Sequence, residues 1–263
     1  MRLGSARPTS VLIVGNWCRP LAQSAHRAGI DAVVFDLFAD ADTQHYARAA
    51  YCVADVDQRH IDVQLAATLV QQFGGDCAAL VYAAGFERAP EQLLHIAAGR
   101  SIFGNSAASV RAVKQPAALC ALLQQVGMPY PETRLAAPEI ADGWLLKRTG
   151  EQGGAHVLPL ARSCRAQPGD YFQRRLDGTP CSALFLADGA RARIIGFSEQ
   201  LTAAVGDAPY CYAGALSHAG LPPTISADIT SKLDAIVRGA GLVGLNSIDF
   251  IVAGNNYFVL EIN

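Results

Sequence analysis

Residues 11–36 read VLIVGNWCRPLAQSAHRAGIDAVVFD, and this stretch decides the fold class. It predicts an apolar strand over 11–14, a helix over 21–28 and a second apolar strand over 32–35. Short apolar strands that alternate with amphipathic helices are typical of a parallel sheet covered on both faces. The stretch therefore predicts an α/β fold built on a parallel sheet.

The same alternation continues through the first hundred residues. It predicts a helix over 61–73, a third strand over 77–82 and a helix over 91–98. Parallel sheets bind ligands at the carboxyl ends of their strands. The Gly-x-Gly-x-x-Gly fingerprint of dinucleotide-binding sheets is absent, so NAD binding has no support. The residues expected at the ligand edge are Gly15-Asn16-Trp17, Asp36 and Gly85-Phe86-Glu87.

The pattern changes after Asn105, where helices are followed by strands and turns. One or two helices are expected over 106–126, with Pro116 opening the second. Strands are expected from Trp144 onward. The elements expected in this part are a hairpin of 182–186 with 192–197, a helix over 227–239 with Ser226 as its N-cap, and a final hairpin of 248–252 with 257–262.

The composition excludes several classes of protein. Hydrophobic residues make up 51% of the 263 residues and charged residues 17%, which indicates a well-filled core. With 21 basic and 23 acidic residues, the net charge of -2 provides no basic surface for a nucleic-acid backbone. No apolar run approaches the roughly 20 residues that span a bilayer. The N-terminus lacks the apolar region of a secretion signal, so we expect a cytoplasmic protein.

The seven cysteines stand singly in the sequence. None belongs to a Cys-x-x-Cys pair, so a zinc site has no support. Several, such as Cys77 and Cys120, lie among Ala, Leu and Val. We expect them to be small buried hydrophobic residues in a reducing cytosol.

Lys147 ends a predicted strand and is followed by Gly150, Gly153 and Gly154. A glycine-rich turn can lay its backbone N–H groups against phosphate oxygens, and a lysine adds a compact positive charge. The alternative is an ordinary hairpin turn with a surface lysine. The chain has only three lysines among its 21 basic residues. One explanation is a codon bias that favours arginine and leaves three lysines by chance. They are Lys114, Lys147 and Lys232.

The final predicted hairpin carries Asp249, Glu261 and Asn263. Residues i and i+2 of a strand share a face, so Glu261 and Asn263 point the same way, and cross-strand pairing can bring Asp249 alongside. Three oxygen ligands on one face suit Mg²⁺, which keeps water and phosphate oxygens in its other positions. A solvent-facing polar stripe is the alternative, and the apolar neighbours on both strands disfavour it.

Together with a strand expected from Asp170, whose backbone could bind an adenine edge, these motifs resemble the ATP-grasp superfamily of carboxylate–amine ligases. Lys114 and Lys147 fall on the two positions where that family has lysines. The most specific similarity is the Asp…Glu-x-Asn ending. The stretches that carry the resemblance are Gly104-Asn-Ser with Arg-Ala-Val-Lys114, Leu145-Leu-Lys147 with Gly153-Gly154, Ile248-Asp249-Phe-Ile and Leu260-Glu261-Ile-Asn263.

The resemblance implies an ATP-grasp fold with α/β and α+β lobes. It implies an N-terminal Rossmann-like pre-ATP-grasp domain over 1–105, a lid subdomain over 106–172 and a C-terminal metal- and nucleotide-binding subdomain over 173–263. Three groups of site residues follow from it. They are Lys147 and Arg193 as catalytic residues; Lys114, Lys147, Gly150, Gly153, Gly154, Gln173, Arg174 and Leu176 as nucleotide contacts; and Asp249, Glu261 and Asn263 as metal ligands.

The implied activity is that of an ATP-dependent ligase. ATP phosphorylates a substrate carboxylate, and an amine then displaces phosphate to form an amide while ADP is released. The implied cofactors are ATP and Mg²⁺, for which Mn²⁺ can substitute. The implied partners are a small carboxylate and a small amine, with no nucleic acid and no membrane, and a homodimer is left open. Candidate substrate contacts, each also explicable as an ordinary surface charge, are Glu87, Arg174, Arg175 and Arg193.

The sequence departs from the family pattern in the hinge and at its end. Gln173 stands where many members have an acid, and Cys181 stands near the place of the ribose-binding Glu, for which Asp177 could substitute. The family usually continues with Pro and Arg after Glu-x-Asn. Either a segment after Asn263 is missing from the sequence, or the site lacks one wall.

The substrates are not readable from motifs. The Gly-Phe-Glu turn at residues 85–87, the Gly-Asn-Ser stretch and the short ribose region look most like ligases that attach glutamate to small amines, including tyramine–glutamate ligases of methanofuran-type pathways. Trp17, Phe86 and Tyr210 could line an amine pocket or belong to the core. The competing interpretations are an ATP-binding regulatory or scaffold protein without ligase activity, and a plain α/β binding module.

Overall fold

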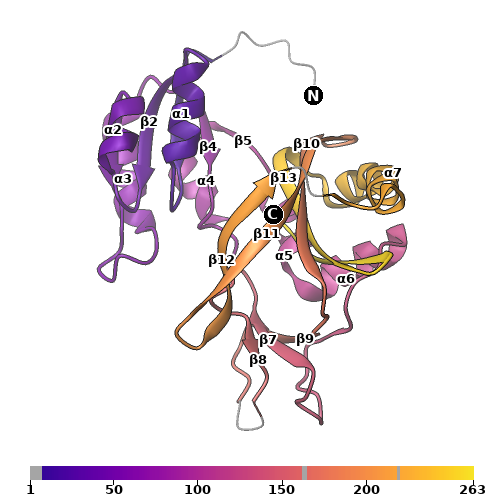
Figure 1. The fold of residues 1–263 in the computed structure, drawn as a ribbon. Coiled ribbons are helices and arrows are strands. Elements are labelled where there is room, and N and C mark those ends of the chain that lie inside the picture. The colour runs from indigo at the N-terminus through magenta and orange to yellow at the C-terminus, as the bar shows by residue number, and fades with distance from the viewer. Residues whose placement is uncertain (1–7, 162–164, 218–219) are drawn as a thin grey trace. The chain divides into compact units, whose positions relative to one another are not determined.

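The computed structural model describes residues 8–161, 165–217 and 220–263. The chain forms two compact units, one that ends at Gly104 and one that begins at Asn105 (Figure 1). We describe each unit by itself. The further division of the second unit at residue 172 stays a prediction.

The first unit is a five-stranded parallel sheet with helices on both faces, as predicted. Its strand order is β3-β2-β1-β4-β5. One face of β1 and β2 packs against α1 and α2, and the opposite face packs against α3 and α4. The elements are β1 Ser10–Val14, α1 Arg19–Arg27, β2 Asp31–Asp36, α2 Ala41–Tyr46, β3 Ala49–Cys52, α3 Val63–Phe73, β4 Ala79–Tyr82, α4 Gln92–Ala97 and β5 Ser101–Phe103.

At the carboxyl edge of this sheet, the segments that follow β1 and β4 lie close together. A Cβ on Gly15 would lie 2.5 Å from Ala83 Cβ, and the Asn16 N–H donates to Ala84 O at 2.7 Å. Of the aromatic residues that could have lined a pocket here, Phe86 is buried in the core, whereas Trp17 is 57% exposed and stacks on Phe38. Phe86 is therefore a core residue and no ligand contact.

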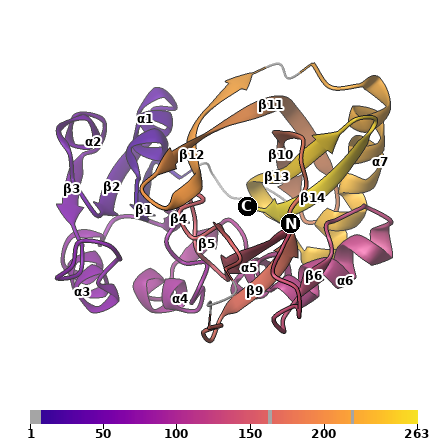
Figure 2. The ribbon, with the colours of Figure 1, turned by 60° about the horizontal axis from the view of Figure 1, so that its bottom comes forward.

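The second unit contains two sheets. A five-stranded antiparallel sheet, whose strands Figure 2 labels, has the order β12-β11-β10-β13-β14. A four-stranded antiparallel sheet has the order β6-β9-β7-β8. The elements are α5 Ala107–Lys114, α6 Pro116–Val126, β6 Thr133–Arg134, β7 Trp144–Arg148, β8 Leu158–Pro159, β9 Asp170–Arg174, β10 Thr179–Asp188, β11 Ala192–Val205, β12 Ala208–Ser217, α7 Pro223–Ala240, β13 Val243–Ala253 and β14 Asn256–Ile262.

The core of the second unit lies between one face of the five-stranded sheet and the helices α6 and α7. Ile229 and Leu233 of α7 are fully buried there, as are Phe185, Phe250 and Ile262 on the strands. Because side chains alternate along a strand, the neighbours of these residues point to the opposite face. Asp249 and Glu261 therefore lie on the face that the helices do not cover.

Two expectations about this unit and its cysteines are wrong. Helix α7 begins at Pro223 with Pro222 as its N-cap, because proline is well suited to a first turn in which its missing N–H has no partner; Ser226 lies inside the helix and bonds Pro223 O. Cys77 is buried as expected, but Cys120 is half-buried and Cys52 is exposed. Cys164 lies outside the described residues.

Candidate active site

The final hairpin brings the three predicted metal ligands together. Asp249 on β13 pairs with Glu261 on β14, next to a bulge at Phe250. The Asn263 amide donates from Nδ2 to Asp249 Oδ2 at 3.0 Å, and the Ser247 backbone fixes Asn263 through two hydrogen bonds of 2.8 Å. These two carboxylates and one amide provide oxygen atoms of the kind that Mg²⁺ prefers.

Ser182 on β10 was not predicted from the sequence, and it completes this cluster. It lies directly opposite Asp249 in the β10–β13 pair, and its hydroxyl donates to Asp249 Oδ1 at 2.6 Å. Only the register of the two strands reveals this partner. Both side chains are buried, so the hydrogen bond fixes the orientation of the Asp249 carboxylate.

The two carboxylates of the cluster have opposite pKa shifts. Burial, with the negative charge of Glu261 in addition, raises the pKa of Asp249 to about 6. Desolvation by itself would raise the pKa of Glu261, but the positive charges of Lys114 and Lys147 outweigh it and lower that pKa. Near neutral pH the pair therefore holds two negative charges in one place, and such a pair attracts cations.

Lys114 supplies one of these positive charges. It ends α5, its side chain is 9% exposed, and its Nζ donates to Asn263 Oδ1 and lies 3.9 Å from Glu261 Oε2. The sequence placed Lys114 on the nucleotide phosphates. In the structure its ammonium instead contacts two of the candidate metal ligands.

Lys147 is buried rather than a surface lysine. It lies on β7 with 8% of its surface exposed, and its Nζ donates to Gln173 Oε1 at 2.7 Å. Gln173 on β9 is itself held by Thr133 Oγ1 at 3.2 Å. Burial lowers the pKa of Lys147, and the charges of Glu261 and Asp249 oppose that shift. A side-chain amide thus holds a desolvated ammonium group on which the charges of both carboxylates act.

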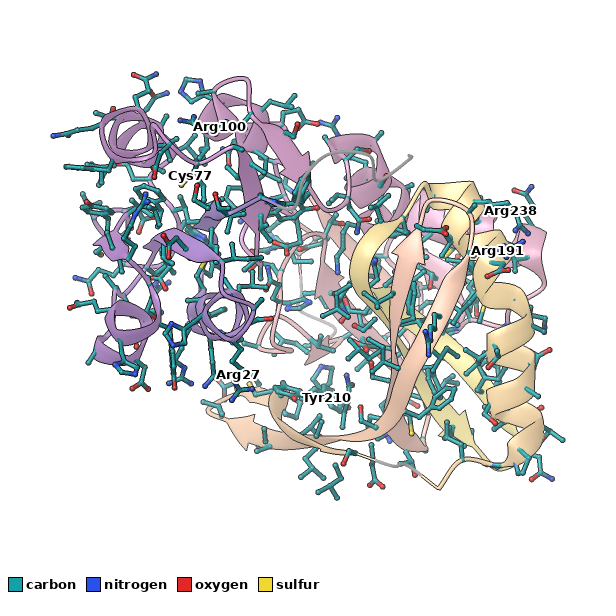
Figure 3. The ribbon with its side chains drawn as sticks, turned by 90° about the horizontal axis from the view of Figure 1, so that it is seen from above. Arg27, Cys77, Arg100, Arg191, Tyr210 and Arg238 are labelled. Atoms are coloured by element: carbon teal, nitrogen blue, oxygen red, sulfur yellow. The ribbon has the colours of Figure 1, made fainter. Side chains whose placement is uncertain are left out.

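The glycine-rich loop that follows β7 rests on β12. The Tyr212 N–H donates to Gly153 O at 2.9 Å, and a Cβ on Gly154 would lie 1.9 Å from the carbonyl oxygen of Tyr210. Figure 3 labels Tyr210 on β12. Gly150, Gly153 and Gly154 all have φ between 72° and 78°, a conformation that favours glycine. The loop therefore needs glycine both for its turns and for its close approach to β12.

The hinge residues differ from the sequence prediction. Arg174 neighbours Gln173 on β9, so its side chain points to the other face, where it bonds Asp142 O at 3.0 Å and lies 5.5 Å from the Trp144 ring. The N–H groups of Arg174 and Arg175 already donate to Glu132 O and Gly143 O. These two N–H groups are therefore committed within the protein and are not free for an adenine.

The candidates for ribose and substrate contacts are also occupied elsewhere. Arg175 pairs with Asp177 at 3.1 Å, and Cys181 is buried in the core. Leu176 is half-buried. Asp177, the residue that could substitute as the ribose contact, is exposed and forms its ion pair with Arg175.

Arg193 is not brought to the metal-ligand cluster. It pairs with Leu186, which lies four residues from Ser182 on β10. At about 3.3 Å per residue this places Arg193 on the same face as Asp249 but roughly 13 Å along the strands. A catalytic role at the phosphate has no support from this position.

A pocket in the second unit is lined by several of these groups, among them Lys114, Gln173 and Glu261. Besides predicted residues it contains His156 and Tyr171, which the sequence did not single out, and Cys120, which the sequence predicted only as a buried hydrophobic residue. His156 follows Gly154 by two residues, and that proximity to the glycine run is the signal that could have found it. The pocket lining includes Lys114, Thr133, Gly150, Glu151, His156, Tyr171, Gln173, Leu260 and Glu261.

A comparison with protein families matches residues 117–263, more than half of the chain, to the family described as ATP-grasp domain. The chain belongs to the ATP-grasp family. This confirms the resemblance inferred from Lys147 and the Asp…Glu-x-Asn ending. No curated protein matches the sequence significantly.

Solved structures confirm the ATP-grasp fold. Biotin carboxylase from Campylobacter jejuni aligns with a TM-score of 0.77 and 13% identity over 98% of this chain and 65% of its own. Pyruvate carboxylase from Rhizobium etli aligns with a TM-score of 0.76 and 14% identity over 98% of this chain and 26% of its own. L-amino acid ligase from Bacillus licheniformis aligns with a TM-score of 0.74 and 13% identity over 98% of this chain and 67% of its own. The chain thus spans about two thirds or less of these relatives, and at such identities they show the fold alone.

Within the part of the chain that the structure describes, no helix combines the length and the apolar character needed to cross a membrane.

Proposed function

We propose that this ATP-grasp protein is an ATP-dependent ligase that joins a carboxylate to an amine through an acyl phosphate. The observation that carries the proposal is the convergence of a buried, oriented Lys147 with Asp249, Glu261 and Asn263 beside a glycine-rich loop. Phosphoryl transfer requires positioning and charge neutralisation more than covalent help from the protein. The cluster offers both.

Asp249, Glu261 and Asn263 would hold Mg²⁺, with Ser182 orienting the first of them. The metal ion, when bound, neutralises charge on the phosphate oxygens. Two carboxylates with an amide fit a hard cation, and Mn²⁺ has the same preference for oxygen. Lys114 now occupies part of this ligand set, so we propose that it turns from Asn263 to the nucleotide phosphates when the cation binds.

Lys147 contributes a second fixed charge. Its ammonium is desolvated, and electrostatic interactions are stronger in such surroundings than in water. The Gln173 amide keeps it oriented before the substrate arrives. We assign it the role of stabilising the transferring phosphoryl group.

The loop that contains Gly150, Gly153 and Gly154 would cover the phosphates with its N–H groups. An acyl phosphate is hydrolysed by water, so exclusion of water protects the intermediate. The loop packs on β12 through Gly153 and Gly154, and β12 would then support the cover. Gln173 and Leu176 remain proposed contacts of the nucleotide base, through side-chain and apolar surface rather than through the N–H groups of Arg174 and Arg175.

Within this class we propose glutamate and a small aromatic amine as the substrates, in a cytoplasmic enzyme. The support is the similarity of the motifs around residues 85–87 and 104–106 to glutamate–amine ligases. One solved relative is named an L-amino acid ligase, so its carboxylate is an amino acid. Arg193, exposed on the same face as Asp249, is a proposed contact of the substrates rather than of the phosphate. Glu87, whose Oε2 accepts a hydrogen bond from the Gly85 N–H at 2.9 Å, stays a candidate from the sequence alone.

An ADP-release screen of amino acids crossed with amines, run with Mg²⁺–ATP, tests the function. Hydroxylamine in place of the amine should trap the acyl phosphate as a hydroxamate and release ADP. Release of AMP and pyrophosphate would mean that the protein adenylates its substrate instead. Tight nucleotide binding without ADP release from any mixture would favour a regulatory ATP-binding protein.

A further inference from the structure

His156 is a polar side chain in the candidate pocket that the metal ligands and the lysines leave unused. It lies in the glycine-rich loop, two residues after Gly154, and lines the pocket with Lys114, Gln173 and Glu261. Its Nδ1 atom is buried and has no hydrogen-bond partner within the described part of the chain. Buried nitrogen atoms without a hydrogen-bond partner are rare in native proteins, so each one suggests that a bound molecule supplies the partner.

The surroundings of the ring indicate the chemistry of that partner. Burial lowers the pKa of His156, Glu261 raises it, Lys147 lowers it again, and Glu151 and a hydrogen bond with the Gln152 backbone raise it. Charges of both signs therefore act on the ring, and Nδ1 is the nitrogen left without a partner. Lys114 lines the same pocket, the positive charge of Lys147 acts on both His156 and Glu261, and positive-φ glycines shape the loop. Two lysines and a glycine-rich loop together attract an anion with several oxygen atoms, which is a phosphate.

We propose that His156 Nδ1 donates a hydrogen bond to the β- or γ-phosphate of the bound nucleotide. The inference rests on the proposed function, because it places a nucleotide in this pocket. The orphaned nitrogen gains its partner only when the phosphates are present. His156 therefore adds nucleotide selectivity to a loop in which the other contacts come from the backbone.

The two ring nitrogens can be separated with amide variants. His156→Asn places an amide nitrogen near the position of Nδ1, His156→Gln reaches toward that of Nε2, and His156→Phe keeps a ring without either. His95→Ala, an exposed histidine on α4, serves as the matched control. Dissociation constants for Mg²⁺–ATP, Mg²⁺–ADP and AMP are measured for each protein by calorimetric titration.

His156→Phe should bind ATP and ADP about tenfold or more weakly, because a hydrogen bond to a charged group is lost. His156→Asn should recover most of that affinity, and His156→Gln should not. AMP should bind all proteins alike, since it lacks the β- and γ-phosphates. The melting temperatures without ligand should stay close to that of the wild type.

Equal ATP affinity in all variants would overturn the inference while leaving the proposed function intact. An equal loss for AMP would also overturn it, because the ring would then act on the base or on folding. Wild-type protein that binds neither ATP nor ADP would overturn the proposed function and this inference together.

Discussion

Two buried aspartates, Asp36 in the first unit and Asp249 in the second, show how differently one residue type is used. Asp36 accepts hydrogen bonds from the backbone N–H groups of Cys18, Phe38 and Ala39. Asp249 accepts from Ser182 and Asn263 and faces a second carboxylate, Glu261. The first carboxylate is saturated by its own chain, whereas the second pair keeps negative charge that a cation can use. Burial of a carboxylate alone therefore does not indicate a functional site. Two neighbouring carboxylates that both stay charged indicate a cation site.

Replacing each aspartate by asparagine tests this contrast with the largest expected effect. Asp249→Asn should lower turnover by about 10³-fold, on the scale of lost electrostatic stabilisation at an active site. Its unliganded stability should hold or rise, because the repulsion from Glu261 disappears. Asp36→Asn should instead destabilise the fold by about 1–3 kcal/mol, since an amide cannot accept all three N–H bonds.

The measurement is turnover per folded molecule together with urea unfolding of both variants. If Asp36→Asn lost activity without losing stability, the first unit would contain a functional carboxylate. If Asp249→Asn unfolded easily and kept its activity, the two aspartates would have exchanged roles.

Lys147→Ala tests the contribution of a positive charge to the same site. Turnover should fall by about 10²-fold or more, because an oriented charge next to the phosphate is lost. The variant should also lose about 1–3 kcal/mol of stability, since Gln173 then has a buried oxygen without its donor. A surface lysine, the alternative that the sequence left open, would instead give a stability change near zero.

Lys232→Ala is the control for this substitution. Lys232 lies on α7 and bonds Asp228 and Gly127 O near the surface, so its removal also deletes two hydrogen bonds. Turnover should stay at the wild-type level. Steady-state ADP release by the two variants gives the answer, and equal activities would remove Lys147 from the site.

The sequence predicted the alternating strands and helices of the first unit and the hairpin that carries Asp249 and Glu261. It missed β3, β5 and α2, because β3 and β5 are short strands at the two edges of the sheet and α2 is a short helix begun by an Asp40 cap. Local pattern reveals elements that bury a continuous face. Short elements at the edge of a sheet depend on neighbours that are distant in sequence.

The same reason explains what the sequence revealed of the site. The spacing of Glu261 and Asn263 along one strand suffices to place them on one face. The partners Ser182 and Gln173 come from other strands, and only the register of β10 and β9 shows what they touch. Arg174 and Arg193 were assigned by resemblance alone, and the structure places neither beside the metal-ligand cluster.

Substitutions at two neighbouring glycines of the loop test the role of backbone conformation, and we expect a smaller effect on activity than from the charged residues. Gly154→Ala would bring a Cβ within 1.9 Å of the Tyr210 carbonyl, whereas Gly153→Ala meets no atom within 4 Å. Both residues have positive φ, so each substitution costs roughly 1–2 kcal/mol of backbone strain. Gly154→Ala should in addition raise the KM for ATP about tenfold, because weak loop packing costs affinity at that scale. Equal KM values for the two variants would show that contact with β12 does not hold the loop.

The dependence of unliganded stability on pH is the smallest predicted effect, and it tests the charge pair directly. Burial and Glu261 raise the folded-state pKa of Asp249 to about 6, above its usual value. The folded protein therefore holds this proton more strongly than the unfolded chain does, and the free energy of unfolding should decrease as pH rises from about 4 to 6. The lowered pKa of Glu261 acts in the opposite sense at the acidic end of this range, so the net decrease should be on the order of 1 kcal/mol. Unfolding in urea at a series of pH values measures it, and Asp249→Asn should abolish the decrease while Asp36→Asn keeps it. An identical pH profile in Asp249→Asn and wild type would mean that the two carboxylates do not repel each other, and the case for a cation between them would lose its electrostatic basis.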